Sequence, residues 1–449
     1  MNADPRAALA AAPMRRLQIV VVALCIALNA LDGFDVLAIS FAAPGIAAEW
    51  GITRATLGIV LSMELFGMAA GSVLIGNVAD RIGRRPTILA CLVVMAAGMF
   101  LAAAANGVAM LSVTRLLTGL GIGGMISSTS AVVAEFSNAR RRSLNVTLNI
   151  AGYSTGAILG GIVASALLTA SGDWRAVFVF GGVMTLAALP ITFWLLPESI
   201  ESLIARRPPD ALERINRTLV RLRVERIDAL PSHSERSDRP SIASLFSPGY
   251  ARVTLLLTVA YFAQIMLFYY VQKWIPKIVV DLGFEPASAG RVLVWANVGN
   301  LLGALAIGLA AQRLSLRPLI IGAMLGGFAA IAVFGLQFQS LRQLSLTAMV
   351  AGFFINASVV GLYPILAQVY PAALRASGIG FVIGVGRGGS ALGPVVAGAL
   401  FTAGAGLLWV SLTMGAGALI AAMMLVLLPR ALGSHSTSQL VAASASARR

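Results

Sequence analysis

The stretch Gly76-Asn-Val-Ala-Asp80-Arg81-Ile82-Gly83-Arg84-Arg85-Pro86 decides how this sequence folds, because a weaker copy of it returns 232 residues later. The copy is Gly308-Leu-Ala-Ala-Gln312-Arg313-Leu314-Ser315-Leu316-Arg317-Pro318. Two further sets agree at shifts of 232 and 233, namely Leu195-Leu196-Pro197 with Leu427-Leu428-Pro429, and Gly156 and Gly160 with Gly389 and Gly393. Three agreements at nearly one offset predict two halves in parallel duplication.

The composition around these repeats excludes a soluble protein. Of the 449 residues, 58% are hydrophobic and 11% are charged, whereas a soluble domain carries roughly 25% charged residues. The apolar residues form runs of twenty or more, long enough for each run to span a bilayer as a helix. Cys25 and Cys91 both lie inside such runs and provide no disulfide framework. We therefore expect a polytopic membrane protein rather than a soluble enzyme.

The apolar runs predict twelve transmembrane helices. We place them at 17–42, 54–77, 86–105, 108–134, 143–169, 175–196, 251–280, 287–311, 317–337, 343–368, 376–402 and 406–428. The expected fold is an all-α membrane protein with two pseudo-symmetric six-helix bundles. The predicted domains are an N-terminal bundle over 1–196, a cytoplasmic linker over 197–250 with a helix around 211–224, a C-terminal bundle over 251–428 and a disordered cytoplasmic tail over 429–449.

The arginines predict the orientation of these helices. If both termini are cytoplasmic, the inner segments hold 25 of the 31 arginines and the outer segments hold four. An excess of arginine on the cytoplasmic side is the usual signature of membrane topology. This distribution also accounts for the net charge of +15 without nucleic acid as a partner. We expect a multi-pass protein of the cell inner membrane, in contact with the lipid bilayer and monomeric.

Several motifs carry a family resemblance that covers nearly the whole chain. The loop from Gly76 to Arg85 resembles the signature loop between helices 2 and 3 of the major facilitator superfamily. Arg115-Leu-Leu-Thr-Gly119 and Leu196-Pro-Glu-Ser199 resemble that superfamily's helix-4 motif and helix-6 end. The region from Tyr370 to Arg387 resembles its helix-10/11 region. The resemblance implies a transporter, not an enzyme, that works by alternating access.

A narrower resemblance concerns the substrate. Leu31-Asp32-Gly33-Phe34-Asp35 together with Trp274-Ile-Pro276 is similar to the aromatic acid:proton symporters within that superfamily. The resemblance implies import of an aromatic carboxylate, of the benzoate or phenoxyacetate type, together with a proton. Two alternatives stay open, namely a proton-coupled exporter of drugs or metabolites and a substrate sensor of the same fold without transport.

Four charged residues inside the predicted helices are candidates for proton coupling. Asp32 and Asp35 are three residues apart and share one helix face, and a carboxylate at the bilayer centre usually faces a cavity or a partner. The alternative is a structural pair that caps a kink at Gly33. Arg115 lies at a comparable depth and could pair with the aspartates as they change protonation, or it could be a fixed structural arginine. Glu64 could join a proton relay or satisfy a neighbouring helix.

Arg387 is the leading candidate for the substrate's carboxylate, because a guanidinium group can hold a carboxylate through two hydrogen bonds. A packing role among polar neighbours is the alternative. Aromatic and amide side chains would form the rest of the site, and Asp32 and Asp35 would also face the substrate there. We expect Tyr269, Trp295 and Gln264 to contribute.

The Gly76–Arg85 loop is the candidate for a conformational latch. Asp80 lies where the second helix ends, and arginines beside it could bridge to neighbouring helix ends. The predicted latch residues are Gly76, Asp80, Arg81, Gly83, Arg84, Arg85 and Glu135. Anchoring of the loop to the cytoplasmic side by its arginines is the simpler interpretation.

No cofactor and no metal site are expected. Gly119-Leu-Gly-Ile-Gly-Gly124 and Gly384-Val-Gly-Arg-Gly-Gly389 both fit a dinucleotide-binding pattern, but neither follows a strand. Small residues that allow close contact between membrane helices explain both stretches better.

Overall fold

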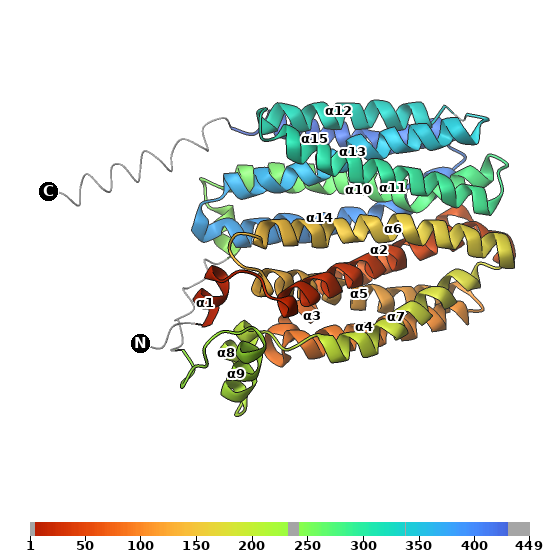
Figure 1. The fold of residues 1–449 in the computed structure, drawn as a ribbon. Coiled ribbons are helices and arrows are strands. Elements are labelled where there is room, and N and C mark those ends of the chain that lie inside the picture. The colour runs from red at the N-terminus through yellow and green to blue at the C-terminus, as the bar shows by residue number, and fades with distance from the viewer. Residues whose placement is uncertain (1–4, 232–241, 337, 430–449) are drawn as a thin grey trace. The chain divides into compact units, whose positions relative to one another are not determined.

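The structure is a computed structural model that describes residues 5–231, 242–336 and 338–429. Within these ranges the elements are helices (Figure 1). Twelve of them are long and apolar enough to cross a membrane, which confirms the predicted number. They are α2 (Arg16–Trp50), α3 (Arg54–Ile82), α4 (Arg84–Ala103), α5 (Val108–Phe136), α6 (Arg142–Ser171), α7 (Arg175–Leu195), α10 (Ala251–Asp281), α11 (Pro286–Ala310), α12 (Leu316–Phe334), α13 (Leu341–Val369), α14 (Ala372–Thr402) and α15 (Leu407–Val426).

The first span is longer than the sequence predicted. α2 continues through Pro44 and ends at Trp50, and Gly51 closes it with a left-handed φ of 58°. Pro44 cannot donate a backbone hydrogen bond and commonly ends a helix. Here Ala42 and Ala43 before it and Ile46 after it are fully buried. Packing against neighbouring helices therefore maintains the helix past a residue that usually interrupts it.

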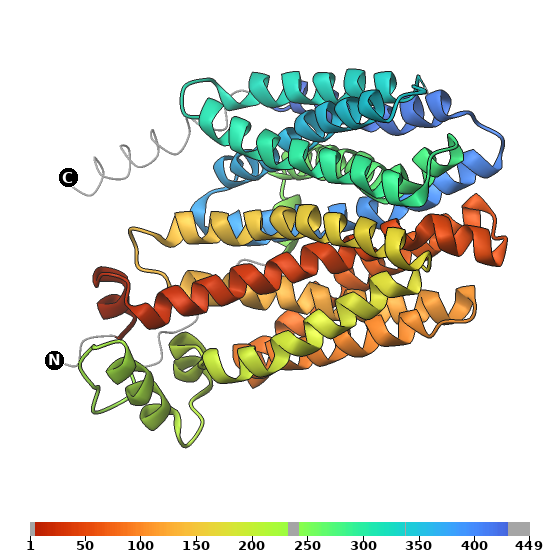
Figure 2. The same ribbon diagram turned by 45° about the vertical axis from the view of Figure 1, so that its right-hand side comes forward.

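Three shorter helices form a second hydrophobic core at one end of the N-terminal helices. They are α1 (Pro5–Ala11), α8 (Ile200–Arg206) and α9 (Ala211–Arg221), and Figure 2 shows α8 and α9 as the green helices beside the red N-terminal segment. α9 confirms the helix expected around 211–224. Leu9 of α1 packs with side chains of α8, α9 and the turn after them, namely Ile200, Leu203, Ile204, Ile215, Leu219, Leu222 and Ile227.

Glycines set the spacing of the helices that surround the buried charges. A Cβ atom on Gly119 would collide with the backbone oxygen of Glu64 on α3, and one on Gly123 would collide with that of Met68. A Cβ atom on Gly156 of α6 would likewise collide with the carbonyl of Ala30 on α2. These contacts confirm that the 119–124 glycines serve close helix packing. They bring α5 against α3 and α6 against α2.

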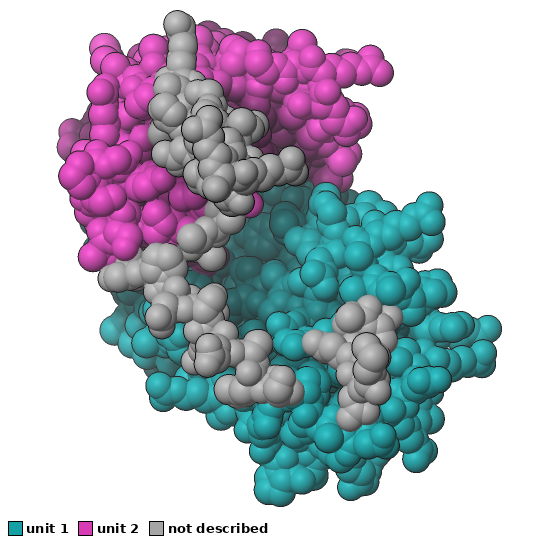
Figure 3. Space-filling model, turned by 90° about the vertical axis from the view of Figure 1, so that its left-hand side faces the viewer, with its two compact units in different colours: residues 1–235, 272–297 teal, residues 236–271, 298–449 magenta. Residues whose placement is uncertain are grey.

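The chain divides into two compact units (Figure 3). The first contains Met1–Glu235 together with Gln272–Asn297, and the second contains Arg236–Val271 together with Val298–Arg449. The boundaries therefore fall inside α10 and α11. The division into a 1–196 bundle, a 197–250 linker and a 251–428 bundle stays a prediction. The predicted tail over 429–449 lies outside the described residues from position 430 onward.

Candidate functional site

Five charged side chains are fully buried in the first unit. Asp32 and Asp35 come from α2, Glu64 from α3, Arg115 from α5 and Lys273 from α10, and each is 0% exposed. We call these five residues the charge cluster. Burial of an ionised group costs several kcal/mol unless it is paired and hydrogen-bonded. The partners of each group therefore decide which of them carry a charge.

Glu64 pairs with both basic residues of the charge cluster. Its Oε1 accepts a hydrogen bond from Arg115, and its Oε2 lies 3.1 Å from Nζ of Lys273. One carboxylate thus bridges a guanidinium and an ammonium group, and this pairing offsets the cost of burying all three. Two roles were predicted for Glu64. The contacts agree with one of them, which is to pair with polar groups of neighbouring helices, and its part in a proton relay stays a prediction.

Arg115 is held by several further contacts. Its Nη2 donates to the backbone oxygen of Asp35 at 2.9 Å, and its Nη1 lies 3.0 Å from the sulfur of Met99. The guanidinium carbon also lies 5.4 Å from the ring centre of Phe178, within the range of a cation–π interaction. These contacts fix the guanidinium group beside α2.

The two aspartates differ from Glu64 because no cation touches their carboxylates. Among the residues that the structure describes, neither oxygen of Asp32 has a hydrogen-bond partner, and Oδ1 of Asp35 has none. Oδ2 of Asp35 receives a long hydrogen bond of 3.4 Å from the hydroxyl of Thr185. A buried carboxylate without a donor is far less costly when it carries a proton. The aspartate pair is therefore the part of the charge cluster best suited to bind one.

Gly33, between the two aspartates, has a packing role. A Cβ atom on Gly33 would collide with the backbone oxygen of Tyr153 on α6, and α2 is one continuous helix through this position. The carboxylate of Asp32 therefore caps no backbone group in the described part of the chain. The glycine places α6 directly behind the aspartates.

Lys273 is the member of the charge cluster that sequence reasoning missed. Its Nζ donates to the backbone oxygen of Val36 and to Glu64. The sequence places it near the end of an apolar run, where lysine usually marks the membrane boundary. The signal that could have identified it is its separation from Lys277 by one helical turn, since only one of the two needs to reach the helix end.

The predicted latch residues meet at the end of α3. Arg84 lies 3.0 Å from Asp80 and 3.6 Å from Glu135 at the end of α5. Glu198, which follows α7, accepts the backbone N–H groups of Arg84 and Arg85 at 2.8 and 3.3 Å. It satisfies two of the backbone donors that a helix leaves open in its first turn. Glu198 was not among the predicted latch residues.

The remaining latch residues take different positions. Gly83 has a φ of 112°, and a side chain there would collide with Glu198. Arg85 donates to the backbone oxygen of Phe193 at 2.7 Å and lies 4.9 Å from its ring centre. Arg81 is exposed. A Cβ atom on Gly76 would make only an ordinary contact of 3.7 Å with Ser127, so packing does not demand glycine there.

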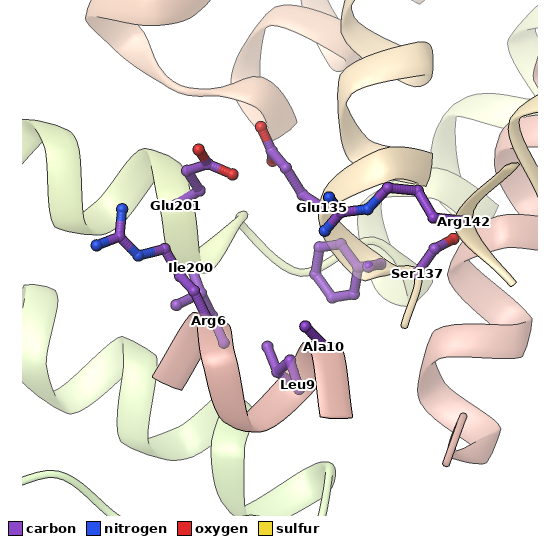
Figure 4. A pocket seen from close by; sticks show the side chains of 9 residues that line it. Arg6, Leu9, Ala10, Glu135, Ser137, Arg142, Ile200 and Glu201 are labelled. Atoms are coloured by element: carbon purple, nitrogen blue, oxygen red, sulfur yellow. The ribbon is translucent and has the colours of Figure 1, made fainter. Parts of the chain in front are cut away.

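A pocket of about 40 Å³ lies beside Glu135. Figure 4 shows Glu135, Ser137 and Arg142 on one side of it, with α1 and the start of α8 on the other. Its remaining lining residues are Arg6, Leu9, Ala10, Phe136, Ile200 and Glu201. The volume fits a water molecule or two and is too small for an aromatic acid.

The second unit contains the other predicted substrate residues, except Trp295. Arg387 is partly buried. Gln264 is fully buried and donates to Ser358 at 2.6 Å. Tyr269 packs edge-on against Phe268, with 5.2 Å between ring centres. Trp295 belongs to the first unit and is 49% exposed.

The structure therefore brings together Asp32, Asp35, Glu64 and Arg115, and it also brings together most of the predicted latch. Their functions, and those of Arg387, Tyr269, Trp295 and Gln264, stay predictions. In the described ranges, no group of three His, Cys, Asp or Glu side chains could hold a metal ion.

Sequence comparison identifies the family. A profile of the Major Facilitator Superfamily matches residues 24–290 and 257–446. The chain belongs to the Major Facilitator Superfamily. Members of this superfamily are multi-pass membrane transporters, which agrees with the twelve spans, and the chain is a transporter rather than an enzyme.

Two curated relatives of this Major Facilitator Superfamily chain come from Pseudomonas putida. One is a gallate transporter, 31% identical over 400 residues that make up 88% of each chain. The other is the 4-hydroxybenzoate transporter PcaK, 32% identical over 85% of this chain and 86% of that transporter. These similarities confirm the resemblance to aromatic acid transporters that the sequence motifs indicated.

A solved structure agrees on the fold. The crystal structure of a D-xylose-proton symporter aligns with a TM-score of 0.71 over 93% of this chain and 99% of the symporter, at 19% identity. At this level of identity the similarity establishes the major facilitator fold alone.

Proposed function

We propose that this transporter imports an aromatic carboxylate together with a proton. The observation that carries the proposal is the contrast inside the charge cluster. Glu64 is paired with two cations, whereas in the described part of the chain no cation forms an ion pair or hydrogen bond with the carboxylate oxygens of Asp32 and Asp35. We infer that Glu64 stays ionised between its two cations, while the aspartates bind and release the proton.

The proton would act through the cost of burying charge. A protonated aspartate is tolerated in a closed, dry environment, whereas an ionised one favours a state in which water or a cation reaches it. Loss of the proton would therefore bias the protein toward a conformation that opens the cluster to water. Such coupling between protonation and conformation is what a symporter requires.

The proposed substrate class rests on relatives and on residue chemistry. Gallate and 4-hydroxybenzoate, which the two relatives are named for, each combine an aromatic ring with a carboxylate. Arg387 would bind the carboxylate through two hydrogen bonds, and Tyr269 would offer a ring for stacking. Gln264 and Trp295 would complete the contacts as predicted from the sequence.

The loop after α3 would act as the conformational latch. Arg84 connects Asp80 with Glu135, and Glu198 connects the start of α4 with the segment after α7. Breakage of these contacts would accompany the change of state. The arginine distribution supports a location in the inner membrane with both termini cytoplasmic, and we propose that the protein acts as a monomer.

Uptake into proteoliposomes tests the proposal. Purified protein is reconstituted, and accumulation of radiolabelled 4-hydroxybenzoate is measured with an inward proton gradient and after its collapse by a protonophore. We expect accumulation only with the gradient. Asp32→Asn and Asp35→Asn should each abolish gradient-driven accumulation while substrate exchange at equal pH persists. Accumulation that ignores the gradient in the wild-type protein would sink the symport proposal.

A further inference from the structure

The charge cluster contains an unequal number of acids and bases. The cluster has three carboxylic acids, from Asp32, Asp35 and Glu64. It has two basic groups, the guanidinium of Arg115 and the ammonium of Lys273. With both aspartates protonated, the cluster holds one surplus positive charge. With one aspartate ionised, the charges balance, and with both ionised a negative charge remains.

Lys273 creates the surplus. Glu64 would be neutralised by Arg115 alone, because the two already form an ion pair. The ammonium group of Lys273 is nevertheless buried beside them, with one donor on Glu64 and one on the backbone of Val36. A lysine ammonium has three donors, so these two contacts leave one donor for another acceptor.

Both cations also reach the same turn of α2. Arg115 donates to the backbone oxygen of Asp35, and Lys273 donates to that of the next residue, Val36. Both cations are therefore fixed beside the aspartates without touching their carboxylates. Their field acts on the aspartates at short range in a region with little water, where charge interactions are much stronger than in bulk solvent.

We propose that Lys273 is a positioning residue of the transport cycle. Its charge, balanced against that of Glu64, sets how many protons the aspartate pair holds and adds a positive field that favours an anionic substrate. The inference rests on the proposed proton-coupled import and assigns to Lys273 and Glu64 a role within it. Lys273 acts through the field of the charge cluster and need not touch the substrate.

The charged groups of the cluster lie on four helices, and α6 and α7, which also pack against α2, add the hydroxyl of Thr185 on α7. Asp32 and Asp35 lie on α2, Glu64 on α3, Arg115 on α5 and Lys273 on α10. The thiol of Cys91 on α4 is buried within electrostatic range of Asp32. Since a neutral thiol contributes no net charge, the two cations and Glu64 set the field on the aspartates.

The charge count makes opposite predictions for two single variants. In Lys273→Met, the cluster with both aspartates protonated is neutral, so the protons are held more tightly. The pH at which uptake falls to half, which we call the half-uptake pH, should rise by about one unit. This is the effect of a unit charge at roughly 10 Å with an effective dielectric constant of about 20. In Glu64→Gln the surplus grows to two, so this pH should fall by a similar amount.

The double variant Glu64→Gln/Lys273→Met separates charge from packing. It loses both buried partners, but it has the same net charge as the wild-type cluster. If charge decides, its half-uptake pH should return to within a few tenths of a unit of the wild-type value. If the two residues serve only packing, the double variant should instead be at least as impaired as the worse single variant.

The substrate affinity provides a second readout. KM for 4-hydroxybenzoate at a fixed acidic pH should rise about tenfold in Lys273→Met, because one unit charge near the site is lost. It should recover in the double variant, and Lys273→Arg, which keeps the charge, should stay close to the wild-type value. Equilibrium binding of labelled 4-hydroxybenzoate to purified protein gives the same comparison for variants that bind but do not transport.

Lys277→Met is the matched control. Lys277 lies one turn further along α10 and pairs with Asp281, which also pairs with Arg54. Its removal changes the formal charge of the chain by the same amount outside the cluster, so the half-uptake pH should stay unchanged.

The two proposals fail differently. If the wild-type protein accumulates 4-hydroxybenzoate without regard to the proton gradient, the proposed function fails. If gradient-driven uptake is present but the half-uptake pH does not follow the cluster charge in the two single variants and the double variant, the role of Lys273 fails and the proposed function stands.

Discussion

Arg115 donates a hydrogen bond to the backbone oxygen of Asp35 at 2.9 Å, while Oδ1 of the same aspartate has no partner in the described residues. The arginine is therefore tied to the helix that carries the aspartate rather than to its titrating atoms. Binding or release of a proton at Asp35 can occur without breaking an ion pair. The backbone contact therefore holds Asp35 in place whether or not its carboxylate carries a proton.

The first prediction concerns that contact. Arg115→Met should lower the free energy of unfolding by about 3 kcal/mol, the lower end of the cost of breaking a buried ion pair, because Glu64 keeps Lys273 as its partner. Arg115→Lys should recover part of this loss but not uptake, since lysine cannot reach Glu64 and the Asp35 carbonyl with one planar group. Thermal unfolding in detergent and proteoliposome uptake measure the two effects. Equal uptake in Arg115→Lys and wild type would contradict the prediction.

The second prediction concerns the first turn of α4. Glu198→Ala removes the acceptor of two backbone N–H groups in a largely buried position and should destabilise the protein by about 1–3 kcal/mol. Glu198→Gln retains an acceptor oxygen and should lose less. Glu213→Ala is the control, because Glu213 is an exposed side chain of α9 that pairs with the exposed Arg217, and its loss should change the melting temperature little. A melting temperature that is the same in Glu198→Ala and Glu213→Ala would refute the capping role.

The third prediction tests the packing behind the aspartates. Gly156→Ala places a Cβ atom against the backbone carbonyl of Ala30, so α2 or α6 must move. Overpacking typically costs about 1–3 kcal/mol, and we expect lower stability and a loss of most uptake, because Asp32 lies half a turn from the collision. Gly322→Ala on α12 meets open space and should keep wild-type uptake. Normal uptake in Gly156→Ala would show that the close approach is dispensable.

The fourth prediction concerns recognition of the carboxylate. Arg387→Met should raise KM for 4-hydroxybenzoate about 10–100-fold, which corresponds to about 1.5–3 kcal/mol for hydrogen bonds to a charged group. The KM of Arg387→Lys should lie between those of the wild type and Arg387→Met, because lysine offers charge without the two paired hydrogen bonds of a guanidinium group. Competition with 4-hydroxybenzamide, which has no carboxylate, gives the control, since its weak inhibition should not change between variants. An unchanged KM in Arg387→Met would assign the carboxylate to another residue.

The twelve spans could be predicted because each apolar run is long enough to cross a bilayer without help from distant residues. The boundaries of the spans are less predictable, as the end of the first span shows. The predicted span ends at residue 42, but α2 continues through Pro44 to Trp50, with Ala43 and Ile46 buried. Packing partners that lie far away in the sequence decide such boundaries.

Four residues of the candidate site could also be predicted from the apolar runs. Asp32, Asp35, Glu64 and Arg115 stand out because each is a charge inside an apolar run. Their pairing does not follow from the sequence, since Glu64 and Lys273 are 209 positions apart. Glu198 was also missed, because a carboxylate in a polar segment gives no sign that it binds the backbone of a helix that begins 114 positions earlier.

The small core formed by α1, α8 and α9 has a consequence for how the protein is made. α1 leaves the ribosome before α8 and α9, whose side chains cover Leu9 and begin at Ile200. At the usual pace of synthesis this gap corresponds to roughly 10–40 s. During that time six membrane helices emerge, while Leu9 lacks the α8 and α9 side chains that cover it in the folded protein. We therefore expect Leu9 to be more accessible in chains that end before Ile200 than in the folded protein.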